Sequence, residues 1–177
     1  MKSIIKLEKV SRVHPIYYEI RNRHYVANHG CIGRQLHYLI YRNNEPIGII
    51  SGASAVWACK PRDDFFSINK ENRAKKIGKI INNVVYRIEF KEKNLATRVL
   101  SLFRKQVIKD WEERYKDNVV GFETFVFGKN RTGALYKADN WIYCGVTSGS
   151  AKYKPHGAYN KGERKTVAKK FIFCKNV

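Results

Sequence analysis

Residues 82–115, "NNVVYRIEFKEKNLATRVLSLFRKQVIKDWEERY", hold two hydrophobic periods in one continuous segment. Residues 82–90 alternate with period two, which predicts a β-strand with Val84, Tyr86, Ile88 and Phe90 on one side. From about residue 95 to 115, apolar residues recur every fourth position, as on the buried face of an α-helix. That stripe consists of Leu95, Val99, Phe103, Val107 and Trp111, widened by Leu100 and Ile108. The segment therefore predicts a central strand, a short loop and a long helix that Asn94 caps.

Further strands and helices are expected on both sides of this segment. The apolar runs 35–42 and 46–52, joined by "NNE", predict a β-hairpin. The other expected elements are a first strand within residues 1–10, short helices within 13–26, a basic helix over 68–82, strands at 119–127, 141–146 and 169–175, and a short helix over 134–139. Alternating strands and helices predict an α/β (α+β) fold, a central mixed β-sheet flanked by helices. The length suits a single domain, residues 1–177, with a basic C-terminal segment.

Charge is the strongest signal in the composition. Thirty-five Lys and Arg against fifteen Asp and Glu give a formal net charge of +20. Such an excess favours a polyanionic partner, because neutralising phosphates releases condensed counterions. Residues 152–177 are the most basic part, with eight Lys or Arg against Glu163 alone. We expect duplex DNA as a partner; basicity serving solubility alone is the alternative.

Cysteine spacing and hydropathy limit the other classes of function. The cysteines at positions 31, 59, 144 and 174 form no C-x-x-C pair, so reduced thiols are expected rather than structural zinc. No run approaches the roughly 18 apolar residues of a membrane span, and the N-terminus reads as a strand rather than a signal peptide. We expect a cytoplasmic protein without a membrane partner, in the host cytoplasm if a phage encodes it.

Polar residues of catalytic type lie in two short segments. Tyr136 and Asp139 stand three apart on the expected short helix and so share one face. His24 and Tyr25 follow the basic "RNR" and precede a loop, where imidazole could act as a base or a metal ligand. Asp139 as a surface cap, and His24 as a phosphate or solvent contact, are the alternatives.

One carboxylate lies on the expected strand 119–127. Burying Glu123 alone would be costly, so it is either functional or paired, and Arg87 is the expected partner. Arg34, before the hairpin, is a candidate for phosphate binding. Trp57, Phe65 and Phe66 flank "KPRDD", where aromatics beside Lys and Arg would suit a flipped base, although core packing is the more frequent role.

Three segments together resemble known families. The order of strand, loop and long helix is similar to the GNAT acyltransferase superfamily, and "ALYKADNW" resembles its "LY-x-x-x-GF" segment. "NRHY" at 22–25, "KNLATRVLSLFRKQVIKDW" at 93–111 and "GALYKADNWIYCG" at 133–145 resemble the phage Mom family, which modifies adenine in DNA to a carbamoylmethyl form. They also resemble the DruA family of Druantia anti-phage defence systems.

The resemblance implies a set of site residues. Tyr136 would be the general acid, and Asp139 would position His24 or an ion, with Tyr25 and Glu123 completing the catalytic set. The superfamily's glycine-rich phosphate loop reads "EKNLAT" here, so Asn94 and Ala96 replace glycines. The amides of Leu95, Ala96 and Thr97 would cradle a phosphate; a plain N-cap at Asn94 is the alternative. The predicted DNA contacts are Arg21, Arg23, Arg34, Lys152, Lys154, Arg164 and Lys165.

The resemblance also implies three functions. The first is a phage-encoded transferase that alters adenine N6 in duplex DNA to evade restriction, with a small-molecule group donor. An acyl-CoA-type donor and iron are the candidate cofactors, and the metal is unassigned. The second is a non-catalytic DNA-binding component of a DruA-like defence system, and the third an ordinary GNAT N-acetyltransferase. For catalysis, we expect His24 and Tyr136 to share an exposed cleft, on the order of 10 Å apart.

Overall fold

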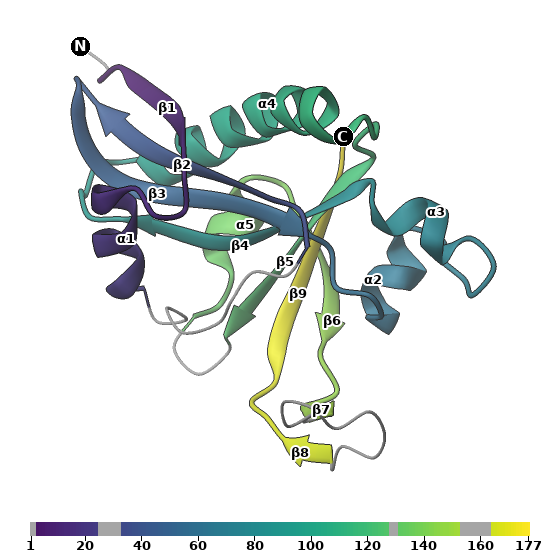
Figure 1. Ribbon diagram of the computed structural model, residues 1–177. Coiled ribbons are helices and arrows are strands. Elements are labelled where there is room, and N and C mark those ends of the chain that lie inside the picture. The colour runs from purple at the N-terminus through teal and green to yellow at the C-terminus, as the bar shows by residue number, and fades with distance from the viewer. Residues whose placement is uncertain (1–2, 25–32, 128–130, 153–163) are drawn as a thin grey trace.

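The computed structural model describes residues 3–24, 33–127, 131–152 and 164–177. Among them, seven strands form one mixed sheet in the order β1-β2-β3-β4-β5-β9-β6 (Figure 1). Their bounds are β1 Ile5–Val10, β2 Gln35–Arg42, β3 Glu45–Ser54, β4 Ile80–Ile88, β5 Gly121–Phe127, β9 Lys170–Asn176 and β6 Ile142–Val146. Strands β7 (Ser150–Lys152) and β8 (Arg164–Thr166) pair separately. The helices are α1 Pro15–Asn22, α2 Lys60–Phe65, α3 Arg73–Ile77, α4 Leu95–Tyr115 and α5 Ala134–Ala138.

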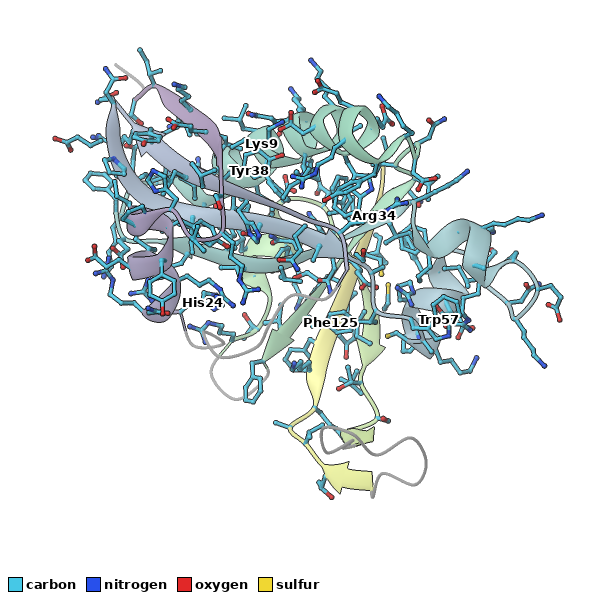
Figure 2. The ribbon with its side chains drawn as sticks, in the orientation of Figure 1. Lys9, His24, Arg34, Tyr38, Trp57 and Phe125 are labelled. Carbon is cyan, nitrogen blue, oxygen red and sulfur yellow. The ribbon has the colours of Figure 1, made fainter. Side chains whose placement is uncertain are left out.

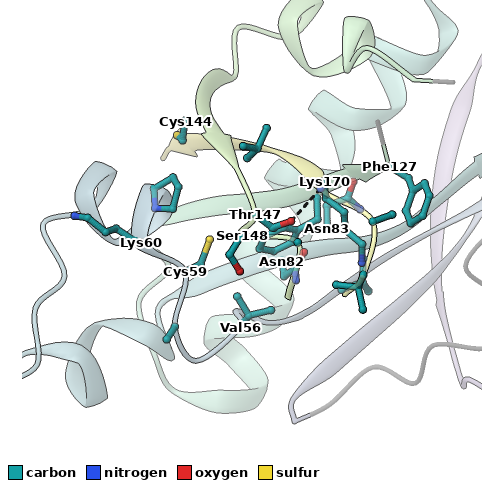
Figure 3. A pocket seen from close by; sticks show the side chains of 18 of the residues that line it. Val56, Cys59, Lys60, Asn82, Asn83, Phe127, Cys144, Thr147, Ser148 and Lys170 are labelled. Carbon is teal, nitrogen blue, oxygen red and sulfur yellow. Dashed lines mark hydrogen bonds between the residues drawn. The ribbon is translucent and has the colours of Figure 1, made fainter. Parts of the chain in front are cut away.

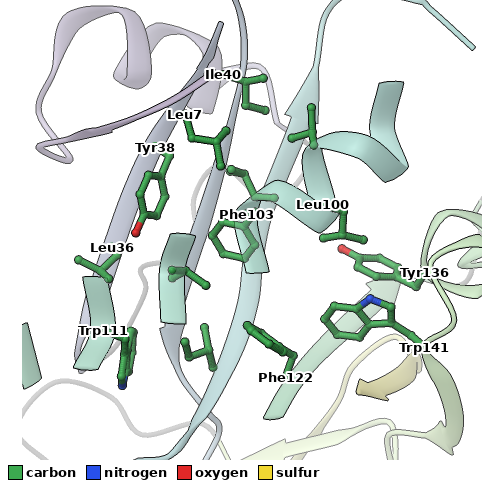
Figure 4. Packing of buried hydrophobic residues seen from close by; sticks show 14 of the residues in the cluster. Leu7, Leu36, Tyr38, Ile40, Leu100, Phe103, Trp111, Phe122, Tyr136 and Trp141 are labelled. Carbon is green, nitrogen blue, oxygen red and sulfur yellow. The ribbon is translucent and has the colours of Figure 1, made fainter. Parts of the chain in front are cut away.

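The long helix α4 covers one face of the sheet. Its buried residues are those of the predicted stripe, and the ends of the helix match the predicted ones. Phe103 packs among alternate residues of β2, such as Tyr38, and Leu100 lies close to the Tyr136 region (Figure 4). The prediction of a long helix with this buried face is confirmed, because its side chains recur at the α-helical period.

Helix α1 covers the opposite face. Tyr17 and Ile20 of α1 pack against Leu39, Ile49 and Val85, which alternate with the residues that face α4. A buried hydrogen-bonded group fixes this contact, since the Tyr17 hydroxyl lies 2.9 Å from His37 Nδ1 and 2.6 Å from Ser51 Oγ. The sheet is therefore covered on both faces, as the predicted mixed α/β fold requires.

The basic helix predicted over residues 68–82 is wrong. Only residues 73–77 are helical, and Ile80, Ile81 and Asn82 begin β4. The basic and apolar residues of this segment are spaced as in a helix. Its apolar end instead forms a strand that pairs with β3 on one side and β5 on the other. In this case tertiary packing overrides local propensity.

Strand β4 also departs from simple alternation. Ser51 pairs with Val85 and Gly52 with Asn83, so Val84 is an extra residue in a β-bulge. Val84 therefore packs with the α1 side, whereas Tyr86 and Ile88 pack with the α4 side. The prediction that Val84, Tyr86 and Ile88 share one face is wrong, because a bulge reverses the alternation.

Three of the four cysteines lie in the described residues. Cys59, Cys144 and Cys174 are free thiols there, and Cys31 lies outside the described ranges. No helix in the part of the chain that the structure describes is long and apolar enough to cross a membrane.

Candidate functional site

The two central strands of the sheet separate part-way along their length. Strands β4 and β5 are parallel and pair only from Ile80–Gly121 to Asn82–Glu123. Beyond this point they diverge, as Figure 1 shows for β5 running away from β4 towards the lower end of the molecule. The bulge at Val84 lies immediately after the last pair and strengthens the local twist. The result is an opening through the middle of the sheet.

Asn83 organises the residues around this opening. Its Nδ2 donates to the carbonyl oxygens of Ser51 (3.0 Å) and Val85 (3.3 Å), within the bulge. Its Oδ1 accepts the Tyr136 hydroxyl at 2.8 Å, and its carbonyl accepts the Thr124 hydroxyl at 3.0 Å. A side chain from α5 and one from β5 are thus both tied to the bulge of β4.

Two cavities meet at the bulge. The larger, about 980 Å³, extends over α2, β6 and the ends of β5 and β9. The smaller, about 370 Å³, extends towards α5 and the end of α1. Asn83, Val84 and Phe125 line both cavities. Molecules in the two cavities would therefore approach each other at one place in the sheet.

Tyr136 lies in the smaller cavity but is largely buried. It is 8% exposed and packs against Trp141 and Phe173, at ring separations of 5.1 and 5.9 Å (Figure 4). Its hydroxyl proton points to Asn83. The expectation of an exposed cleft residue is wrong for Tyr136, because its ring completes the core under α5.

Asp139 ends α5 and has structural partners. Its carboxylate pairs with Arg104 of α4 and accepts the Trp141 indole N–H at 2.8 Å, while Lys175 donates to its carbonyl. These contacts point the side chain towards α4 rather than towards His24. The predicted arrangement, in which Asp139 positions His24, is therefore wrong: Asp139 fixes the turn between α5 and β6.

His24 follows α1 (Figure 2), and it lines the smaller cavity together with Tyr136. The helices that carry these two residues cover opposite faces of the sheet, and the opening between β4 and β5 lets both side chains line one cavity. Burial, followed by the charges of Arg131 and Arg87, lowers the His24 pKa to about 4. The imidazole is therefore neutral near pH 7. Tyr25 lies outside the described residues.

Glu123 is fully buried on β5 and forms an ion pair with Arg62 of α2. The backbone N–H of Val56 donates to its other carboxylate oxygen at 2.8 Å. The predicted partner, Arg87, is wrong, because Arg87 pairs with Glu89 on the surface side of the sheet. Burial raises the Glu123 pKa to about 7, against the opposing effect of Arg62.

The loop between β4 and α4 resembles a phosphate loop in position but not in composition. Asn94 adopts a left-handed backbone (φ 61°, ψ 7°) and makes no side-chain capping hydrogen bond. The Leu95 N–H donates to the Glu92 carbonyl, whereas the first-turn amides of Ala96 and Thr97 have no acceptor within the helix. A hollow of about 490 Å³ lies beside the loop, lined in part by Lys91 and Lys93.

The arginines nearest this loop are already paired with a carboxylate of the protein. Glu92 pairs with Arg42 (2.8 Å) and Arg98 (2.8 Å), and the Ser3 hydroxyl donates to it. The single carboxylate offsets half of the charge of the two arginines and occupies hydrogen-bond donors of both. Any phosphate at this position would depend on the helix amides and the two lysines.

The predicted DNA contacts fall into two groups. Arg21 is 6% exposed, Arg23 pairs with Glu19 and Glu89, and Arg34 pairs with Asp117. Arg21 is thus buried, whereas Arg23 and Arg34 keep 45% and 39% of their side chains exposed, and their contact with DNA stays a prediction. Lys152, Arg164 and Lys165 lie on β7 and β8 with their side chains outside the description, and Lys154 lies outside the described residues.

Sequence reasoning missed Arg62, Asn82 and Asn83. The signal was available: "NN" at 82–83 places two amides in an otherwise apolar strand, where each must find a partner or a ligand. Among the described side chains, no group of three or more His, Cys, Asp or Glu residues could hold a metal ion. An iron site thus has no support from these residues.

The fold places this protein among those with the GNAT acetyltransferase architecture. It superposes with TM-score 0.60 on a Bacillus subtilis acetyltransferase in complex with CoA, at 7% identity over 98% of this chain and 99% of that chain. A GNAT family acetyltransferase from Elizabethkingia anophelis with acetyl-CoA bound gives TM-score 0.56 at 10% identity, over 98% of each chain. The Escherichia coli ribosomal-protein-S18-alanine N-acetyltransferase gives 0.51 at 11% identity, over 98% and 94%.

Sequence comparison gives the family. The model of the Druantia protein DruA matches residues 2–171, so the chain belongs to the DruA family. A search of curated proteins found no match.

Proposed function

We propose that this protein transfers a group from a coenzyme A-type donor to an amine of a nucleic acid. The observation that carries the proposal is the opening between β4 and β5, with a cavity on each side of the bulge. A donor in one cavity and an acceptor in the other would meet beside Asn83 and Val84.

The residues around the opening fit an extended, amide-containing donor. Past Asn82, β4 is no longer paired with β5, so an amide-bearing chain could take the place of a strand through backbone hydrogen bonds. The amides of Ala96 and Thr97, with Lys91 and Lys93, would hold phosphate at the start of α4. When bound, such a donor supplies an activated carbon and a thiolate leaving group.

Three side chains of this chain would serve the transfer. Tyr136 holds its proton on Asn83 Oδ1, and from there the phenol is placed to give it to a leaving thiolate. Neutral His24 lines the same cavity and can accept a hydrogen bond from an N–H group of the donor. Because burial and nearby arginines lower its pKa to about 4, the imidazole stays uncharged near pH 7 and keeps this acceptor.

The acceptor follows from charge. A protein with net charge +20 attracts polyanions and repels protonated amines. Adenine N6 in duplex DNA is the acceptor that we propose. Its nitrogen would bond to the donor's acyl carbon as the carbon–sulfur bond breaks, with the thiolate taking a proton from Tyr136 and the amine proton passing to solvent. The product would carry an N6-acyl group instead of the carbamoylmethyl group of the Mom family. This role would place the protein in the cytoplasm with DNA and a donor pool.

A second candidate rests on the phosphate loop. Glu92 pairs with both Arg42 and Arg98, and asparagine stands where glycine would allow close approach. A loop that no longer binds phosphate would leave a DNA-binding component of a defence system without catalysis. An ordinary N-acetyltransferase is the third candidate, since the fold alone is compatible with it.

Two measurements separate the three candidates. The first is calorimetric binding of acetyl-CoA to the purified protein and to Lys91→Glu/Lys93→Glu, with Lys75→Glu on α3 as the charge-matched control. We expect binding that weakens only in the loop variant. The second is mass spectrometry of nucleosides from a plasmid co-expressed with the protein.

An adenine adduct supports the transferase. DNA affinity with neither donor binding nor adduct favours the non-catalytic component. Donor binding without any DNA affinity favours the ordinary acetyltransferase. Unmodified adenine from cells in which the protein is soluble and abundant would contradict the first proposal.

A further inference from the structure

The two neighbouring asparagines of β4 differ in their hydrogen bonding. Asn83 satisfies its amide through Ser51, Val85 and Tyr136. Asn82 is 5% exposed, and its Oδ1 has no hydrogen-bonding partner among the described residues. A buried amide oxygen without a donor is costly, so such a group calls for a ligand or a function.

Asn82 lies where a ligand could reach it. It is the last residue of β4 that pairs with β5, and it lines the larger cavity together with Asn83. Figure 3 shows Asn82 in the middle of the lining, between Lys60 on one side and Phe127 on the other. Its Oδ1 is itself shielded from the cavity, so the amide would turn on its side-chain bond for an N–H donor there to satisfy this oxygen.

The rest of the lining selects among N–H donors. Val84, Phe125 and Phe127 supply apolar surface, and Lys60 and Lys170 supply positive charge at the edge. A volume of about 980 Å³ lies within the range of about 300–1,000 Å³ typical of ligand cavities. Trp57, between the lining residues Val56 and Ala58, is 63% exposed (Figure 2), as suits stacking with an unpaired base.

The positive charge of the protein disfavours the charged amines of proteins in this cavity and favours the uncharged amines of nucleobases. A lysine side chain or a peptide N-terminus carries a positive charge near pH 7 and would meet Lys170 and the protein's net charge of +20, whereas Lys60 is paired with Asp64 of the same lining. An exocyclic amine of a nucleobase is uncharged, and the attached phosphates are attracted by the excess positive charge.

We propose that Asn82 recognises the exocyclic amine of an unpaired nucleobase inserted into the larger cavity. Its Oδ1 would accept the amine N–H, and its Nδ2 would donate to the adjacent ring nitrogen, the two-bond pattern by which asparagine recognises adenine. The base would have to leave the helical stack to enter the cavity. This inference rests on the proposed nucleic-acid acceptor, and it makes Asn82 the residue that determines base specificity.

The test is a binding measurement that needs no donor. Fluorescence anisotropy would compare oligothymidylates with one central adenine, cytosine, thymine or unsubstituted purine, which lacks the amine. We expect the adenine strand to bind about tenfold more tightly than the purine strand, the size of one good base contact. A preference for cytosine over thymine in place of adenine would assign the same amine recognition to a pyrimidine.

Two variants isolate the contribution of Asn82. Asn82→Leu, close in volume and without polar atoms, should abolish the preference and leave the affinity for thymine strands unchanged. The same substitution at exposed Asn118, Asn118→Leu, is the matched control and should keep the preference. Thermal stability of Asn82→Leu should equal or exceed that of the parent, because it removes an unsatisfied buried oxygen. If Asn82→Leu fails to fold, Asn82→Ser takes its place.

The outcomes distinguish this inference from the proposed function. Salt-dependent DNA binding without a preference for amine-bearing bases, or a preference that survives Asn82→Leu, overturns the role of Asn82 and leaves the transferase intact. A lower melting temperature for Asn82→Leu also counts against it. No binding to any strand overturns both proposals.

Discussion

The buried ion pair between Glu123 and Arg62 connects β5 to α2. Both side chains are fully buried, and Arg62 also donates to Asp63 and to the Val56 carbonyl. Glu123→Ala removes one of the two carboxylates that pair with buried Arg62 and leaves Asp63 as the other. We expect it to lower the free energy of unfolding by about 3 kcal/mol, the lower end of the cost of breaking a buried ion pair, measured by urea denaturation.

An exposed ion pair on the same helix provides the control. Lys60 and Asp64 are 85% and 63% exposed, so Lys60→Ala should cost at most about 1 kcal/mol. Replacing both buried partners, as Arg62→Met/Glu123→Leu, should recover most of the loss. Equal effects of Glu123→Ala and Lys60→Ala would contradict this account of the buried pair.

His37 makes stability depend on pH. Burial, followed by the charges of Arg12, Arg21 and Arg114, lowers its pKa from 6.5 to about 4. Between pH 6.5 and 4 the unfolded state therefore binds a proton that the folded state does not, and stability falls as the pH falls. His37→Asn should flatten the plot of unfolding free energy against pH in that window by about 1.4 kcal/mol per unit.

Tyr17→Phe is the control for His37. It removes the hydroxyl that contacts His37 Nδ1 and Ser51 Oγ but keeps the imidazole. Stability should fall by about 1 kcal/mol at every pH, with the slope below pH 6.5 retained. Parallel pH curves for His37→Asn and the parent would show that another group titrates.

Among the secondary-structure elements, α5 is positioned by the close approach of the Gly133 backbone to the Phe173 ring. Gly133 precedes α5 with φ +72°, and a Cβ there would lie 2.3 Å from the Phe173 ring. Phe173 is fully buried and stacks on Tyr136, so it cannot move aside. We expect Gly133→Ala to lower the free energy of unfolding by about 1–3 kcal/mol through overpacking and to weaken donor binding in the smaller cavity.

Substitution at Gly149 is the control that distinguishes backbone strain from a steric clash with a buried side chain. It has the same φ of +72°, but a Cβ would meet the flexible Lys169 side chain at 3.0 Å. Gly149→Ala should therefore show the cost of the left-handed backbone alone. If it destabilises as much as Gly133→Ala in urea denaturation, the contact with Phe173 contributes nothing.

At the scale of the whole molecule, the net charge of +20 should govern the affinity for nucleic acid. Binding to duplex DNA should weaken linearly in log K against log salt, with a slope of about 0.9 per phosphate contact. Lys152→Ala, Lys154→Ala and Lys165→Ala should each weaken all sequences alike and lower the slope by about one. Binding that does not respond to salt would contradict a nucleic-acid partner.

Local pattern was sufficient for most elements. The hairpin at residues 35–52, the helix at 95–115 and the strand at 121–127 appear as predicted, because each repeats its apolar residues at the period of its own secondary structure. The pattern was insufficient over residues 68–82, where β4 begins inside an apparently helical run. Pairing with β3 and β5 makes the end of this segment a strand.

The candidate site was predicted only in part. His24 and Tyr136 were named from the sequence, and they do line one cavity. Asp139 was assigned to His24 but pairs with Arg104, and Glu123 was assigned to Arg87 but pairs with Arg62. Residue type indicates that a carboxylate needs a partner, whereas its identity depends on which segments the fold brings together.

Most elements, the basic character and the family resemblance follow from the order and chemistry of neighbouring residues, so they can be predicted without coordinates. The place where β4 and β5 separate cannot, since the bulge at Val84 and the last pair, Asn82–Glu123, depend on strands far apart in the chain. The two asparagines of β4 are a further case. They are adjacent and chemically identical, but the fold gives Asn83 a partner in Tyr136 and leaves the Asn82 amide oxygen without one among the described residues.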